Sequence, residues 1–174
     1  MQKWTANADA TPLDVSVLLS KEYLKAYNGG VYGTSNVTFS ALDVSKVNNL
    51  NQSTAKLVAH LNSLGSEAIA QIKIAAQASQ EFYYSDYKDI GDFLKRVEAL
   101  PIKTDSQLIT QVNSDLKSAV LTTDNSTERF AAATGLSIWM PTNTSTYLQR
   151  YQGLQFDKES HWSEFLTTLT AAAP

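Results

Sequence analysis

Few side chains in this sequence could do chemistry as nucleophiles or as general acids and bases. There are two histidines, His60 and His161, and no cysteine among 174 residues. The lack of cysteine excludes a thiolate nucleophile, a disulfide framework and an iron–sulfur cluster supplied by this chain. A metal site built on three histidines is excluded as well. His60 lies inside an expected helix and His161 stands at an expected helix start, so a structural role is favoured for both.

Three aspartates recur at steps of three residues beside a group of tyrosines. Asp86, Asp89 and Asp92 would share one side of a helix. Such carboxylates could bind a hard cation or a basic side chain, although the spacing is not that of a calcium loop. Asp89 and Asp92 also suit the first turn of a helix, where negative charge is favourable. Capping is the favoured interpretation, and Tyr84, Asp86, Tyr87 and Asp89 are candidates for a substrate pocket.

No motif of a known catalytic class is present. The sequence contains no nucleophile elbow, Walker loop, dinucleotide fingerprint or His-Glu-x-x-His pattern. A small hydrolase that uses Asp86 or Asp89 with His161 is a further option, but no spacing supports it. We therefore expect no catalytic residue, metal site or cofactor in this chain.

The length and charge favour one ordinary globular unit. A chain of 174 residues corresponds to a single unit, 1–174, and we expect residues 1–11 and 171–174 to be flexible. The net charge of −3 does not indicate a nucleic-acid partner, and no apolar run approaches the roughly 20 residues of a membrane span.

The polar composition suits a secreted or extracytoplasmic protein. Charged residues make up 18% of the chain, below the roughly 25% of an average domain, so the surface must be rich in Ser, Thr, Asn and Gln. The stretch 1–10 has no apolar core of a signal peptide, so we expect any export signal to lie outside this chain.

Hydrophobic periodicity predicts a helix-rich α/β protein with six or seven helices. Residues 12–28 are predicted to form the first helix, and another begins at Asp89. Only 37–40 and 136–140 are predicted as strands, while 122–127 is predicted as a polar turn. Two short strands make a poor sheet by themselves, which indicates that strands are missing.

Two tryptophans are predicted to join the last helix to a sheet. Trp139 lies in the second predicted strand, and Trp162 lies at the start of the last predicted helix. A buried indole N–H needs a hydrogen-bond acceptor. Both indole N–H groups would therefore need partners if these side chains are buried.

Three segments resemble, in order, the clostripain-like cysteine peptidases. Ala132–Pro141 resembles that family's Gly-Leu-Ser-Ile-aromatic-x-Pro strand. Val37–Ser45 is similar to its Thr-x-Ser-Ala-x-Asp-Leu-Ser segment, and Tyr87–Leu94 to its Asp-Leu-x-Asp-Phe helix start. The C-terminal pattern of Trp162, Phe165 and Leu166 also resembles that family. Together these segments extend the resemblance over about residues 12–170.

The resemblance implies the C-terminal part of a caspase- and gingipain-like three-layer sandwich from a bacterial or archaeal peptidase. Members of the family cleave peptides, often after Arg or Lys, with a His–Cys dyad, and calcium is possible in the intact enzyme. The family's His-Gly and Asp-x-Cys-Leu motifs have no counterpart here, so no catalytic residue is carried over. The resemblance thus implies a chain that is inactive alone. Its partners would be an upstream catalytic half, whose fold and substrate cleft it completes, and a peptide or protein substrate.

A different class of function is compatible with the same residues. The chain could be a stand-alone binding or structural module that kept the scaffold without the chemistry. Its recognition surface would then be the cluster of tyrosines and aspartates at 83–92.

Overall fold

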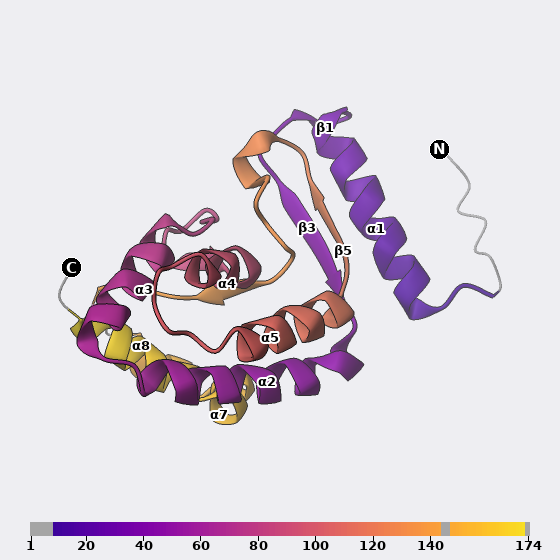
Figure 1. Ribbon diagram of the computed structural model, residues 1–174. Coiled ribbons are helices and arrows are strands. Elements are labelled where there is room, and N and C mark those ends of the chain that lie inside the picture. The colour runs from indigo at the N-terminus through magenta and orange to yellow at the C-terminus, as the bar shows by residue number, and fades with distance from the viewer. Residues whose placement is uncertain (1–8, 144–146, 173–174) are drawn as a thin grey trace.

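The computed structural model describes residues 9–143 and 147–172. Within them it has eight α-helices, one 3-10 helix and six short strands in three two-stranded sheets (Figure 1). The prediction of a helix-rich α/β protein is confirmed, whereas six or seven helices is too few. Most of the predicted flexible ends, 1–8 and 173–174, lie outside the described residues.

The elements follow one another along the chain without an internal repeat. The helices are α1 (Pro12–Tyr27), α2 (Val44–Asn62), α3 (Ser66–Ala78), α4 (Ile90–Glu98), α5 (Ser106–Ala119), α6 (Leu148–Tyr151), α7 (Gln155–Ser160) and α8 (Trp162–Ala171), with the 3-10 helix η1 at Glu128–Phe130. The strands pair as β1 (Asn28–Gly30) with β2 (Gly33–Thr34), β3 (Thr38–Leu42) with β5 (Val120–Asn125), and β4 (Tyr87–Asp89) with β6 (Ser137–Trp139), each antiparallel.

A helical body holds the main hydrophobic core. Helices α2 and α5 run side by side, and α3, α4 and α8 pack around them (Figure 1). The indole N–H of Trp162 donates to the carbonyl of Trp139 at 3.0 Å, and the Trp162 ring contacts Phe93 edge-on. The predicted link between the last helix and a strand is therefore confirmed.

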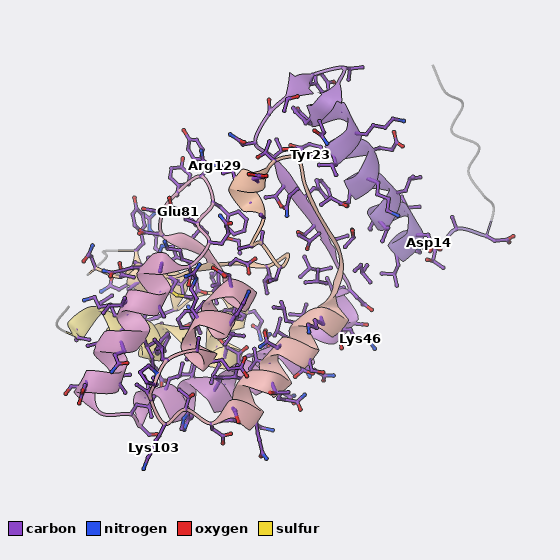
Figure 2. All side chains as sticks on the ribbon, turned by 45° about the horizontal axis from the view of Figure 1, so that its top comes forward. Asp14, Tyr23, Lys46, Glu81, Lys103 and Arg129 are labelled. Carbon is purple, nitrogen blue, oxygen red and sulfur yellow. The ribbon has the colours of Figure 1, made fainter. Side chains whose placement is uncertain are left out.

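The second part is an arm, which we define as residues 12–42 and 120–130. The β3–β5 ribbon is covered on one face by α1, with Tyr23 packed on Phe39 (Figure 2). The hydroxyl of Ser20 donates to the Asp124 carboxylate at 2.5 Å. The main core cluster contains no residue of the arm. The arm meets the body where the Asp43 N–H donates to the carbonyl of Ala119 at 2.8 Å.

The prediction of a turn at 122–127 is wrong, because these residues form most of β5. Its Thr122, Thr123 and Asp124 lie opposite Ala41, Ser40 and Phe39. Their polarity suggested a turn, but the backbone is paired with β3, about 80 residues earlier in the chain, and that pairing decides the conformation. The strand predictions 37–40 and 136–140 correspond to β3 and β6, while β1, β2, β4 and β5 were not predicted.

A fully buried carboxylate, Asp89, joins three segments of the body. It caps α4 by accepting from the N–H of Asp92 at 3.0 Å. It also accepts from the Thr134 N–H at 2.7 Å and from the Thr134 hydroxyl at 2.6 Å. Gly91 leaves room for this contact, since a Cβ there would lie 2.3 Å from the Thr134 hydroxyl oxygen. The capping interpretation of Asp89 is confirmed.

Two buried lysines each bind the C-terminal end of a helix. Lys73 donates to the Ala172 carbonyl at 2.6 Å, beyond the last turn of α8. Lys88 donates to the Gln77 carbonyl at 3.2 Å, at the end of α3. The C-terminus of a helix carries partial negative charge, which stabilises a cation there. The ammonium group of each buried lysine is therefore stabilised in part by the C-terminus of a helix.

We predict that Asp89→Ala destabilises the fold by about 3 kcal/mol, because it leaves the buried N–H of Asp92 and the N–H and hydroxyl of Thr134 without this acceptor. Asp105 is the matched control. It caps α5 by accepting from Gln107 and Leu108, but at an exposed position, so Asp105→Ala should cost about 1 kcal/mol. Urea unfolding followed by circular dichroism measures both. Equal losses for the two variants would contradict the structural role given to Asp89.

Candidate functional site

One hollow in the described part of the chain is lined mostly by aromatic rings. Its volume is about 540 Å³, and it is formed by the loop before β4, by β6 and by the segment around α6. The lining residues are Tyr84, Asp86, Tyr87, Trp139, Tyr147, Arg150, Tyr151 and Leu154. We call it the aromatic hollow.

A tight turn and a strand pair place the first wall of the aromatic hollow. The N–H of Tyr87 donates to the Tyr84 carbonyl at 3.0 Å, which closes the turn that begins β4. The Asp86 carbonyl accepts from the N–H of Met140 at 2.7 Å, and Tyr87 lies directly opposite Trp139 in the β4–β6 register. Backbone bonds thus hold this wall in place.

The second wall comes from α6 and the turn after it. Tyr151 packs on Trp139 with ring centroids 5.1 Å apart. The guanidinium of Arg150 lies 5.9 Å from the centroid of the Tyr147 ring, within the range of a cation–π contact. The hollow therefore combines ring faces with one carboxylate, Asp86, and one guanidinium.

A second hollow of about 350 Å³ shares a wall with the first. Tyr87, Trp139, Tyr151 and Leu154 line both. The residues that line only the second are Leu136, Ser137, Ile138 and Phe156, so this apolar hollow is almost without charge or side-chain donors. Together the two hollows form a groove with the Trp139–Tyr151 pair between its parts.

The hydroxyl of Tyr151 stays protonated over the whole physiological range. Burial, followed by the nearby charges of Asp157 and Tyr87, raises the pKa of Tyr151 above its ordinary value. Inside the groove this side chain can therefore donate a hydrogen bond and never carries the negative charge of a phenolate.

Three of the four predicted pocket residues lie together at the site. Tyr84, Asp86 and Tyr87 line the aromatic hollow. Asp89 is fully buried, and its carboxylate faces Thr134 instead. Asp92 accepts from the Gln80 N–H and from Arg96, so the three aspartates do not converge. That the tyrosines and Asp86 bind substrate stays a prediction.

Sequence reasoning missed the second wall of the hollow. Trp139 was predicted as a packing residue, while Arg150, Tyr151 and Leu154 were given no site role. The signal that finds them is exposure in the folded chain, since Tyr147 and Leu154 remain 61% and 50% exposed despite their apolar surface. Periodicity cannot show which rings remain outside a core.

The two histidines have structural partners. The Nε2 of His60 accepts from the Asp105 N–H at 3.0 Å and so links α2 to the start of α5. His161 adopts a left-handed backbone, with φ of 57°, between α7 and α8, and its ring pairs with Glu164 at 3.0 Å. Asp89 bonds to Thr134 and His161 to Glu164. No hydrogen bond or ion pair joins Asp86 or Asp89 to His161 in the described residues, so the hydrolase option gains no support there.

Neither a metal centre nor a membrane span is found in residues 9–143 and 147–172. No three His, Asp or Glu side chains in these ranges group in a way that could hold a metal ion. No helix there is both long enough and apolar enough to cross a bilayer.

Comparison with known proteins adds the family. Searches of curated proteins and of solved structures gave no match. The model of the Clostripain family, a family of cysteine peptidases, matches residues 1–168. This match covers nearly the whole chain and agrees with the ordered motifs at Val37–Ser45, Tyr87–Leu94 and Ala132–Pro141. The chain therefore belongs to the Clostripain family.

Proposed function

We propose that this chain is the non-catalytic part of a clostripain-type cysteine endopeptidase that cleaves after Arg or Lys. It would complete the fold and substrate cleft of a half that carries the His–Cys dyad. Family membership and the lack of cysteine support this assignment. A cysteine peptidase needs a thiolate nucleophile, so the reacting group must come from another part of the assembled enzyme.

The main support for this proposal is the apolar surface of the arm, which no other described part of the chain covers. Large side chains of α1 and the following turn are exposed, namely Leu13, Val15, Leu18, Leu19, Val31 and Tyr32, the four on α1 by between 40% and 44%. The β3–β5 ribbon has only two strands, and such a ribbon is marginal by itself. A sheet from the catalytic half would extend the ribbon into the three-layer sandwich and cover this surface.

The aromatic hollow supplies a candidate wall for the substrate cleft. Asp86 gives it a carboxylate, and Tyr84 and Tyr87 give it ring faces. A carboxylate beside aromatic rings is favourable for a basic side chain. This arrangement supports a contribution of the chain to substrate binding.

One observation favours the second candidate, a stand-alone binding module. The buried residues of the hydrophobic core come mainly from α2, α3, α4, α5, β6 and α8, and Val120 is the arm residue packed against them. A chain with such a core can fold by itself. In that case the arm would be a peripheral element, and the groove would be the functional surface.

We predict that the pure chain does not hydrolyse peptides that contain Arg or Lys, because it has no thiol nucleophile. Release of a fluorophore from Arg- and Lys-linked peptide substrates measures this, with an active arginine-specific peptidase as the positive control. Turnover that copurifies with the chain through successive columns would rule out the proposed non-catalytic role.

We predict that a His–Cys fragment from the same organism forms a one-to-one complex with the chain and gains peptidase activity. Leu18→Asp, on the arm, should weaken the complex by about tenfold or more, since it places a charge in an apolar interface. Ile74→Asp is the matched control, because Ile74 is also an exposed apolar side chain but lies on α3 of the body. Sedimentation and calorimetry give the affinities.

The same experiment separates the two candidate functions. A chain that melts cooperatively as a monomer, binds no hydrophobic dye and ignores the His–Cys fragment would be a stand-alone module. If both charge variants weakened the complex equally, the arm would not be the interface.

A further inference from the structure

We propose that the groove formed by the two hollows binds a proline-rich peptide segment in the polyproline II conformation. Binding would be a property of this chain alone and does not depend on the proposed peptidase role. The aromatic lining of the groove, its phenol hydroxyls and the partly occupied edge of the adjacent strand favour this occupant.

Exposed aromatic surface in the body is concentrated at this groove. The large apolar side chains exposed on the body are Val44, Ile74, Tyr83, Tyr84, Tyr87, Tyr147 and Leu154, and the last four line the aromatic hollow. Rings that remain exposed give up burial energy in the folded chain. Their gathering in one concave place is typical of a binding surface.

The groove is lined by aromatic rings, as the docking sites of polyproline II segments are. The Trp139–Tyr151 pair stands between two adjoining hollows, and both rings line each of them. A polyproline II segment is an extended three-fold helix without internal hydrogen bonds, and it docks in aromatic-lined grooves. Successive turns of proline and aliphatic side chains would fill the hollows on either side of the ring pair.

Phenol hydroxyls are available for the carbonyls of such a segment. The hydroxyls of Tyr84, Tyr87 and Tyr151 have no hydrogen-bond partner among the described residues, and burial keeps Tyr151 protonated. A polyproline II segment offers carbonyl oxygens but few N–H groups. Donors from the protein therefore match acceptors from the ligand.

Addition of a peptide strand to β6 is disfavoured by the structure. The N–H groups of Ile90 and Met140 bond to Leu136 and Asp86, so Ser137 and Trp139 have their backbone groups on the outer edge of β6. The Trp139 carbonyl on that edge is already occupied by the indole N–H of Trp162. A peptide strand added at this edge would lack part of its backbone hydrogen bonds to β6, whereas a polyproline II segment needs no such bonds.

A sugar ligand is disfavoured by the second hollow. Its own walls are Leu136, Ile138 and Phe156, with Ser137 as their one hydroxyl. Apart from the shared hydroxyls of Tyr87 and Tyr151, these walls offer few partners to the many hydroxyls of a sugar, and unpaired buried polar groups are costly. Proline rings and aliphatic side chains have no polar groups that would be left unpaired in the same hollow.

Calorimetric titration of the full chain with a synthetic peptide of Pro-Pro-Leu repeats tests the proposal. We expect saturable one-to-one binding that Tyr84→Ala weakens about tenfold. Tyr32→Ala is the control, because Tyr32 and Tyr84 are both 66% exposed and Tyr32 lies on the arm. Its affinity should stay within about twofold of the wild type.

Four results would overturn the proposal. One is no heat of binding at millimolar peptide with a chain shown to be folded. Another is equal affinity for a Gly-Ser-Leu repeat peptide, which lacks the preformed helix. The third is saturable binding of a soluble glucose oligosaccharide in place of the proline peptide, because this would assign the groove to carbohydrate. Equal weakening by Tyr84→Ala and Tyr32→Ala would likewise place the peptide elsewhere.

Discussion

The body of this protein depends on one buried carboxylate. Asp89 has no exposed surface, yet it accepts from the helix start at Asp92 and twice from Thr134. A buried charge is tolerated only where hydrogen bonds replace its hydration. Since β4 ends at Asp89, the same contact fixes the strand pair with β6 and the turn that presents Tyr84 and Asp86. The shape of the aromatic hollow follows from this interaction.

The exposed apolar side chains mark the surface that the fold of this chain does not bury. They lie on the arm and around the aromatic hollow, with Val44 and Ile74 elsewhere. A fold that buried all of them would be more stable. We propose a separate contact for each of these two surfaces, one with a folded partner and one with a linear ligand.

Much of the fold could be predicted from local patterns, and the site only in part. The stop after Tyr27, the cap at Asp89 and the strand at Ser137–Trp139 are local, and sequence showed them. Strand β5 was missed because its Thr and Asp residues have a turn-like composition, and only pairing with β3 makes them a strand. Tyr84, Asp86 and Tyr87 were found as a cluster in sequence. Arg150 and Tyr151 join them through the fold, about 60 residues away, and no spacing encodes that contact.

The junction between arm and body has a mechanical consequence. The chain passes from the arm into the body at Asp43 and returns to the arm directly from α5 at Val120, with no loop between helix and strand. The Asp43 N–H bonds the Ala119 carbonyl, so the two crossings are fastened to each other. A rotation of the ribbon therefore turns the ends of α2 and α5 together. Any load placed on the arm is transmitted as torque to the helices that form the hydrophobic core.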